Sequence, residues 1–427
     1  MTTRSLGTKR TSIIMLSVLC ITYAFVCMTK NCFSSAMVFI VNEGLLTKLQ
    51  TGTITAAFYV IYAPLQIVGG MLTDKWKPER FITVGLIGAA VSNLVIFFNQ
   101  SYAVMLVSWC FNALVQFAIW PATFKLVSSV LVSDMRTNAL FIVTFGNPCG
   151  VVISYLLAAI VGAHWQMSFL VSGIGLTVMA LVWEITLHSV KGDMVYTEIA
   201  PAVGEKVEGG TRVSFLPLFF GSGLAVFTVI SFVRTMFDLG IKAMAPTMIN
   251  ESYAEVTPVL STVLSVVILI AGATGPCITR LIYPRFIKNE AVGATVFFGA
   301  ALPLIAGTLL VGKISYYLLI LLLALVVMLM SACSLFTTSY VASRFNTWGK
   351  GATAAGILNC MASLGVVAAN TVFTGVAEGY GWGGTATLWV VMMAAALALT
   401  SITIPIWTRF LQKRCGVKTK GESSAIT

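Results

Sequence analysis

The chain of 427 residues has few charged side chains and almost no histidine. Only 10% of its residues are Asp, Glu, Lys or Arg, whereas soluble proteins carry about 25%. The two histidines, His164 and His188, are too few for a histidine-rich metal site. The nine cysteines contain no C-x-x-C pair, so neither a zinc site nor a disulfide framework is indicated. No glycine-rich stretch ends in Gly-Lys-Ser/Thr, which excludes a nucleotide-driven pump, and we expect no cofactor.

Hydrophobic residues make up 58% of the chain and fall in long runs. Roughly 20 apolar residues suffice for a helix to cross a bilayer, and lipid leaves backbone amides no other partner, so every run is predicted to be helical. The runs lie near 13–41, 52–73, 80–99, 102–131, 137–162, 166–188, 216–249, 256–279, 291–311, 314–341, 352–377 and 385–408. We therefore predict an all-α integral membrane protein with twelve transmembrane helices.

A polar segment separates the first six runs from the last six and suggests the domain organisation. We predict an N-terminal six-helix bundle at 1–188, a linker at 189–213, a C-terminal six-helix bundle at 214–411 and a tail at 412–427. The N-terminal apolar run is too long for the core of a signal peptide, so it is predicted to be the first span.

The distribution of basic residues predicts the orientation in the membrane. Of the 26 Lys and Arg, 20 fall in segments on the side of the N-terminus, and only Lys48 and Lys313 fall on the opposite side. The side rich in Lys and Arg faces the cytoplasm, so both termini and the linker are predicted to be cytoplasmic. The net charge of +11 thus reflects the orientation of the chain in the membrane, and we expect no binding to nucleic acid.

The stretch from Gly69 to Arg80 joins the second and third predicted spans. Its glycines would let two helices pack closely, and its acid and bases stand in a short turn. The predicted gating residues are Gly70, Asp74, Lys75 and Arg80. A second run, Gly275 to Thr279-Arg280, follows about half a chain later with Thr279 in place of the acid. The alternative is that each run is an ordinary polar turn.

Ionisable residues inside the predicted spans are candidates for a binding site, because each costs about 2.5–3.5 kcal/mol at the centre of a bilayer. Lys30 lies well inside span 1, while Arg234, Asp238 and Lys242 in span 7 share one helix face through their i, i+4, i+8 spacing. Cationic walls in a low-dielectric cavity attract anions. The alternatives are that the span 7 residues only neutralise one another, and that Lys30 only bonds a backbone carbonyl or a neighbouring helix.

Further polar and aromatic residues in the spans could line the same cavity. The candidates are Tyr62, Trp120, Lys125, Asn147 and Asn359. Each also has a structural alternative: the aromatic rings could be packing, the amides could bond another helix, and Lys125 lies near a span end from which it could reach the interface.

The six-plus-six arrangement with a repeated loop motif resembles the major facilitator superfamily over essentially the whole chain. Three stretches resemble its organophosphate:phosphate antiporters: Thr29-Lys30-Asn31 onward to Gly44, Gln116 to Trp120-Pro121, and Gly351 to Gly384 around span 11. The resemblance implies two pseudo-symmetric bundles that open alternately to each side. The arginines with which those antiporters bind phosphate match Thr29 and Asp238 here, their span 5 histidine matches Gly146, and their span 2 lysine matches Gln66.

These observations predict a secondary transporter of a small organic anion in the cytoplasmic (inner) membrane, with no enzymatic activity, acting as a monomer. An acid at position 238 would repel a dianion, which favours a carboxylate over a phosphate ester. One alternative is a proton symporter of a neutral or zwitterionic solute with Asp238 as the proton carrier. Another is a membrane receptor that keeps the transporter fold without transporting.

Overall fold

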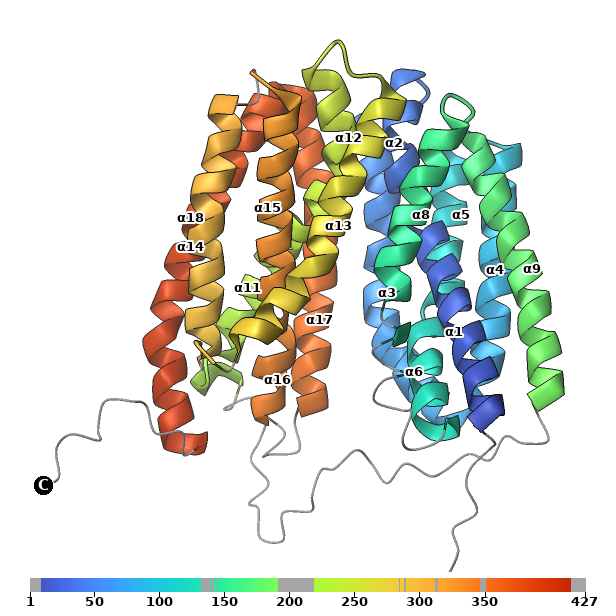
Figure 1. The fold of residues 1–427 in the computed structure, drawn as a ribbon, viewed down its shortest axis with the longest axis horizontal. Helices are drawn as coiled ribbons and strands as arrows, with labels where there is room; N and C mark the ends of the chain where they lie inside the picture. Colours follow the sequence, from blue (N-terminus) through green and yellow to red (C-terminus); the bar gives the residue numbers. More distant parts are fainter. Residues whose placement is uncertain are drawn as a thin grey trace, which may run out of the picture. The chain divides into compact units, whose positions relative to one another are not determined.

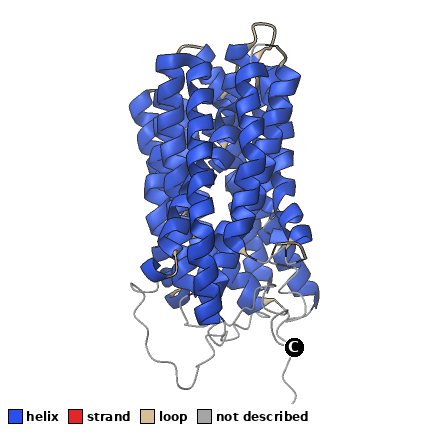
Figure 2. Cartoon of the chain, turned by 90° about the vertical axis from the view of Figure 1, so that its left-hand side faces the viewer, coloured by secondary structure: helices blue, strands red, loops and turns tan. Residues whose placement is uncertain are grey.

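The computed structural model describes residues 9–131, 139, 142–143, 145–190, 219–283, 285–287, 289–311, 314–345 and 351–415. Within these ranges the regular elements are helices, and no strand is present (Figure 2). The helices of the first half are α1 (Lys9–Lys30), α2 (Cys32–Asn42), α3 (Lys48–Lys75), α4 (Pro78–Phe98), α5 (Tyr102–Gln116), α6 (Ile119–Val130), α8 (Gly146–Val161) and α9 (Gln166–Val190) (Figure 1).

The second half continues with helices that include three π-helical segments, labelled η. They are α11 (Leu224–Thr235), η1 (Met236–Gly240), α12 (Ile241–Ser252), α13 (Pro258–Ile282), α14 (Glu290–Val311), α15 (Tyr316–Ser334), η2 (Leu335–Tyr340), α16 (Val341–Arg344), α17 (Gly351–Ala368), η4 (Ala369–Phe373) and α18 (Thr374–Cys415). A π-helix inserts an extra residue into an α-helix and is frequent at functional sites.

Nine helical stretches of the described residues are long and apolar enough to cross a membrane. They confirm the prediction of an all-α integral membrane protein. The last stretch, Ala354–Gln412, includes nearly all of the span predicted at 352–377 and the whole span predicted at 385–408. The chain turns between them at Gly381, whose φ of 69° lies in the left-handed region that favours glycine.

The first span, predicted as one run, is broken between α1 and α2 at Asn31. The side-chain amide of Asn31 donates to the carbonyl of Cys27 at 2.7 Å, and its backbone N–H donates to Met28 O at 3.1 Å. A side-chain amide that bonds the preceding turn competes with the regular helical ladder. The break falls directly after Lys30 and so places this lysine at a bend of the span.

The chain packs into two compact units, each described here by itself. Unit 1 comprises Met1–Ala202, Lys242–Ile270 and Val367–Gly379, and unit 2 comprises Val203–Ile241, Ala271–Val366 and Tyr380–Thr427. Unit 1 therefore contains parts of spans 7, 8 and 11 as well as the first six spans. The predicted linker at 189–213 lies almost entirely outside the described residues, and the predicted boundaries of two six-helix bundles stay a prediction.

In unit 1, glycines allow two helices to pack closely against each other. Gly146 and Gly150 of α8 face α1, where a Cβ at Gly150 would lie 2.8 Å from the backbone nitrogen of Met28. Small residues four apart let two membrane helices pack backbone to backbone. Around this contact, Phe33 of α2 meets the ring of Trp109 at 4.6 Å between centroids.

A glycine near each of the two repeated loop motifs packs closely against a neighbouring helix. A Cβ at Gly69 of span 2 would lie 3.2 Å from Ala118 Cα in span 4, and a Cβ at Gly275 of span 8 would lie 2.6 Å from Ala332 N in span 10. Close helix packing at both glycines agrees with the expectation from the sequence. In the second copy, the Thr279 hydroxyl donates to the carbonyl of Ala332 at 2.6 Å.

Candidate functional site

Lys30 of unit 1 lies against a group of aromatic rings from α3. Its Nζ is 3.8 Å from the ring centroid of Tyr62, 5.2 Å from that of Tyr59 and 5.4 Å from that of Phe58. An ammonium within about 6 Å of a ring centroid is attracted by the negative face of the ring. Within the described part of the chain, Lys30 forms no salt bridge, so its charge is stabilised by aromatic faces and by the side chain of Tyr62, and not by a carboxylate.

The bend in span 1 and the helical spacing of α3 produce this arrangement. Lys30 is the last residue of α1. On α3, Tyr62 follows Phe58 by four positions and Tyr59 by three, and side chains at these spacings are neighbours on a helix surface. Phe58 and Tyr62 stack with 5.2 Å between centroids. We call Lys30 with Phe58, Tyr59 and Tyr62 the aromatic cage.

Two further predicted site residues, Trp120 and Asn147, gather around Tyr23 of α1. The rings of Tyr23 and Trp120 lie 4.9 Å apart between centroids, and Asn147 of α8 lies beside the Tyr23 side chain. A Cβ at Gly146 would lie 3.1 Å from the Tyr23 ring. Tyr23 thus occupies the space beside the position at which the resembled antiporters carry a histidine.

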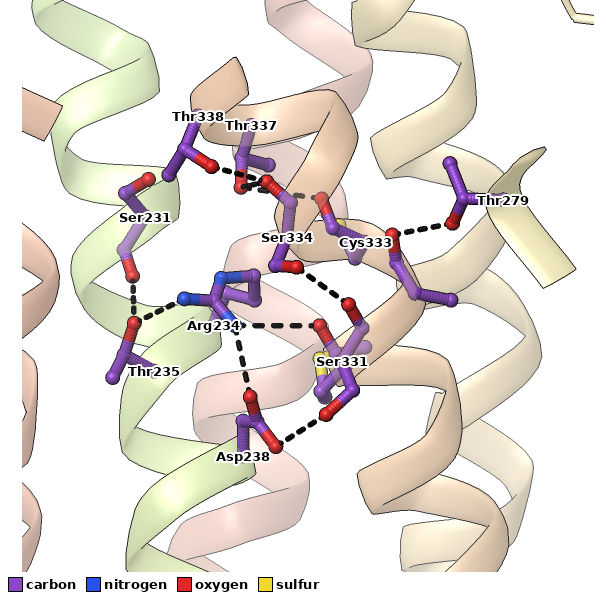
Figure 3. Close-up of polar contacts among 12 residues, drawn as sticks. Ser231, Arg234, Thr235, Asp238, Thr279, Ser331, Cys333, Ser334, Thr337 and Thr338 are labelled. Carbon is purple, nitrogen blue, oxygen red and sulfur yellow. Dashed lines mark hydrogen bonds and ion pairs between the residues drawn. The ribbon is translucent and has the colours of Figure 1, made fainter. Parts of the chain in front are cut away.

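In unit 2, Arg234 and Asp238 form a buried ion pair across the junction of α11 and η1 (Figure 3). Arg234 Nη1 donates to Asp238 Oδ2 at 3.1 Å, and Ser331 of α15 donates to Asp238 Oδ1 at 2.7 Å. The two side chains are 7% and 11% exposed. Each carboxylate oxygen therefore has its own donor, and the pair is neutral as a unit.

Arg234 makes further bonds with its remaining nitrogens. Nη2 donates to Thr235 Oγ1 at 2.6 Å and Nη1 also reaches Met330 O at 3.4 Å. The Nε group is buried and has no partner among the described residues. A buried donor without a partner costs about 1–3 kcal/mol, so a ligand oxygen near Nε would remove an existing penalty.

The structure places the other predicted site residues as follows. The Lys242 carbonyl accepts a hydrogen bond from the Tyr155 hydroxyl at 2.7 Å. Lys125 donates to the carbonyl of Thr73, close to the end of α3, where a cation is favoured by the helix dipole. Asn359 is exposed on α17. Lys30 and Arg234 belong to different units, so the prediction that both face one cavity stays a prediction.

The predicted gating residues lie at the end of α3 and the start of α4. The backbones of Gly70, Asp74 and Lys75 belong to α3, but the side chains of Asp74 and Lys75 fall outside the described part of the structure. Arg80 is exposed on α4. The gating role of Asp74 stays a prediction.

The sequence analysis missed Phe58 and Tyr59 in the aromatic cage and Ser331 as the second donor to Asp238. The spacing of the rings on α3 is visible in the sequence, but their contact with Lys30 depends on the bend at Asn31. Ser331 stands 93 positions from Asp238, and nothing in a run of apolar residues marks it as a partner.

A second polar network of unit 2, also missed, joins Glu290 of α14, Arg344 of α16 and Trp407 of α18. Glu290 is 0% exposed; its Oε1 accepts from Arg344 Nε at 2.8 Å and its Oε2 from Trp407 Nε1 at 2.8 Å. Burial and the charge of Glu290 raise the pKa of Tyr283, which lies just after α13. Both oxygens of the Glu290 carboxylate are thus hydrogen-bonded to protein side chains.

The fold and these sites define a polytopic, all-helical membrane protein with charged groups placed inside its spans. The chain belongs to the Major Facilitator Superfamily, whose family model matches residues 19–370. This finding confirms the resemblance noted in the sequence.

Curated relatives match over part of the chain. The membrane sensor protein UhpC of Escherichia coli is 27% identical over 186 residues, 43% of this chain and 41% of that protein. The UhpC protein of Salmonella typhimurium is 26% identical over 38% of each chain. A probable hexose phosphate transport protein of Chlamydia trachomatis is 26% identical over 25% of this chain and 23% of its own length. The chain thus matches about two fifths or less of these relatives.

Solved structures share the fold over nearly the whole chain. A bacterial homolog of the human lysosomal transporter Spinster, in an inward-facing and unoccupied conformation, matches with a TM-score of 0.74 at 13% identity, covering 95% of this chain and 98% of that one. The nucleoside transporter NupG matches with a TM-score of 0.72 at 12% identity, covering 92% and 100%. At this identity the likeness concerns the fold alone.

Proposed function

We propose that the protein is a secondary transporter that moves a small organic anion across the membrane by alternating access. The observation that carries this proposal is the aromatic cage. Lys30 keeps a positive charge inside a membrane span, forms no salt bridge among the described residues, and is held by the rings of Tyr59 and Tyr62. A cation that has no carboxylate partner can accept an anionic ligand without first giving up a carboxylate.

The charges of the buried groups favour a ligand with a single negative charge. Asp238 neutralises Arg234, so this pair adds no net charge for a ligand. A dianion at 4 Å from Asp238 would meet a repulsion of about 4 kcal/mol per unit charge at an effective dielectric of 20. A monocarboxylate matches the charge of Lys30 and is the substrate class that we favour.

The relatives named as hexose phosphate transport proteins support a phosphate ester as the competing substrate class. Planar, bidentate arginine pairs suit a phosphate group. In this chain the two matching positions hold Thr29, whose hydroxyl donates to Val26 O at 3.0 Å, and Asp238. To bind Arg234, a phosphate ester would therefore have to displace the carboxylate of Asp238 from it.

A second function, sensing without transport, is favoured by the relatives named as membrane sensor proteins. Such a receptor would bind the same anion and report it to a partner. In either case we propose a location in the cytoplasmic membrane with both termini in the cytoplasm, because 20 of the 26 Lys and Arg lie on that side. The proposed role is carried out by a monomer and involves no catalysis.

Uptake into proteoliposomes, measured together with binding, tests the proposal. The purified protein is first screened by thermal shift against monocarboxylates and sugar phosphates, and the best ligand is then offered radiolabelled to sealed vesicles. We expect saturable uptake that is lost in a Lys30→Ala variant. Binding without uptake would instead identify a receptor. No binding of any anion, with uptake of a neutral solute together with protons, would identify the proton symporter.

A further inference from the structure

The Arg234–Asp238 ion pair lies close to two π-helical segments of unit 2. Asp238 belongs to the π-helix η1, and Ser331 stands near the end of α15, shortly before the π-helix η2. Within unit 2, η1 packs against α15 and η2 packs against α11. Because π-helical turns inserted in α-helices are frequent at functional sites, the groups around the Arg234 guanidinium form a candidate site of their own.

The terminal nitrogens of Arg234 bond three oxygens of different chemical kinds (Figure 3). Nη1 donates to the carboxylate of Asp238 at 3.1 Å and to the backbone carbonyl of Met330 at 3.4 Å, while Nη2 donates to the Thr235 hydroxyl at 2.6 Å. Carboxylate and carbonyl oxygens are ligands of hard metal cations, and backbone carbonyls coordinate the coupling Na⁺ of membrane transporters. The partners of this guanidinium are therefore also the ligand types of a metal cation.

The hydroxyl groups at this site direct their protons away from the guanidinium. The Thr235 hydroxyl donates to the carbonyl of Ser231 at 2.9 Å, and the Ser331 hydroxyl donates to Asp238 Oδ1 at 2.7 Å. A hydroxyl has one proton and two lone pairs, so Thr235 presents a lone pair to Arg234. We call these acceptors the oxygen cluster: the Asp238 carboxylate, Met330 O, Thr235 Oγ1 and Ser331 Oγ.

The guanidinium fills the oxygen cluster without using its full bonding capacity. Arginine pairs best with a carboxylate when two of its nitrogens bond the two carboxylate oxygens. Arg234 instead donates to Asp238 Oδ2 with Nη1 and turns Nη2 to a hydroxyl. Its Nε group is buried and has no partner among the described residues. The end of the side chain thus serves the cluster as a positive charge, and not as a bidentate fork.

The charge of the oxygen cluster matches a monovalent cation. Asp238 contributes its one carboxylate, and the other members of the cluster are neutral oxygens. One positive charge therefore balances the site, whereas a divalent ion would leave a net charge that is costly to bury. Oxygen ligands with a single negative charge suit Na⁺, and Arg234 supplies the same charge from within the chain.

We propose that Arg234 is a built-in cation that occupies a monovalent cation site formed by the oxygen cluster, so that the protein works without a coupling Na⁺. A tethered guanidinium keeps the site filled at any ion concentration. Transport is then driven by the gradient of the substrate or of an exchanged anion. This consequence rests on the proposed transport function, whereas the cation site itself is tested without any substrate.

Removing the guanidinium tests whether Na⁺ takes its place. Arg234→Ala keeps every member of the oxygen cluster, and binding of radiolabelled Na⁺ to the purified protein is measured together with Tm. We expect about one bound Na⁺ per chain in Arg234→Ala and none in the wild type. In NaCl, compared with choline chloride of equal ionic strength, the Tm of the variant should rise by about 2–4 °C. Adding Asp238→Asn to Arg234→Ala should abolish both effects.

Two controls separate a cation site from a general effect of salt. Arg234→Lys keeps a tethered positive charge and should stay insensitive to Na⁺. Arg344→Ala also deprives a buried carboxylate, that of Glu290, of its arginine. The other groups that bond Glu290 are donors, namely Trp407 Nε1 at 2.8 Å and the Tyr283 hydroxyl at 3.5 Å. Because these donors are not cation ligands, Arg344→Ala should bind no Na⁺.

A folded Arg234→Ala protein that binds no Na⁺ would overturn the proposal, and so would saturable Na⁺ binding by the wild type. Equal stabilisation of Arg344→Ala by Na⁺ would reveal a general counter-ion effect and would also overturn it. Arg234→Gln, which keeps more of the side-chain volume, carries the same test if Arg234→Ala does not fold. If neither variant folds in NaCl, the proposal is wrong, because Na⁺ should replace the lost charge. A lack of uptake in proteoliposomes would refute transport and leave the Na⁺ result unchanged.

Discussion

The ammonium of Lys30 lies 3.8 Å from the centre of the Tyr62 ring. This contact joins the end of α1 to the middle of α3 and places a positive charge against an aromatic face in the interior of unit 1. A cation–π contact contributes about 0.5–2 kcal/mol, depending on how far the cation is removed from water. It orients the lysine without neutralising it, which is the property that an anion site needs.

Variants of Lys30 and Tyr62 should therefore distinguish the contribution of the lysine charge to anion binding from that of the tyrosine hydroxyl. We expect Lys30→Ala to weaken anion binding about 10- to 150-fold, because a hydrogen bond to a charged group contributes about 1.5–3 kcal/mol. Tyr62→Phe keeps the ring face and should change affinity by less than about threefold. Isothermal titration of the two purified variants measures the difference. Equal losses in both would show that the hydroxyl, and not the lysine charge, binds the ligand.

The carboxylate of Asp238 competes with a ligand for Arg234, so neutralising it should have two opposite effects. Without ligand, Asp238→Asn should lower the free energy of unfolding by about 3–5 kcal/mol, because it leaves a buried arginine without its counter-charge. With a saturating anion, the increase in Tm should be larger than in the wild type. Thermal unfolding with and without the ligand measures both effects.

Ser331→Ala is the matched control for Asp238, because it removes one hydrogen bond to the same carboxylate and leaves the ion pair. We expect a loss of about 1 kcal/mol and no gain in anion affinity. If the wild type binds a sugar phosphate tightly at neutral pH and Asp238→Asn brings no gain, the argument for a singly charged ligand is wrong.

The buried network around Glu290 should matter for stability and not for ligand binding. Glu290→Gln keeps the shape of the side chain but leaves Arg344 without its counter-charge, so we expect a loss of about 3–5 kcal/mol in the free energy of unfolding. Glu255→Gln, at an exposed position, should stay within about 0.5 kcal/mol of the wild type. Denaturant titration in detergent compares them, and an unchanged Glu290→Gln protein would contradict the role of this network.

Several features of the fold could be predicted because they depend on local composition. Apolar runs long enough to cross a bilayer identify helices directly, since lipid leaves the backbone no alternative. The glycine motifs at Gly69 and Gly275 predicted close helix packing, and both glycines do lie against a neighbouring helix backbone. Lys30 and the Arg234–Asp238 pair could be singled out because charge is rare inside apolar spans.

By itself, then, the sequence determined the helical membrane class, because that follows from hydropathy along single spans, and its motifs indicated the family by resemblance. It also singled out Lys30, Arg234 and Asp238 as charges inside spans, but not the buried Glu290. Only the tertiary structure decided what each charge contacts. Lys30 meets rings on α3 because the chain bends at Asn31, and Asp238 receives its second hydrogen bond from a serine 93 positions away. The salt bridge of Lys48 with Glu251 joins residues 203 positions apart. Such contacts depend on how the helices pack and bend, which no periodicity along the chain encodes.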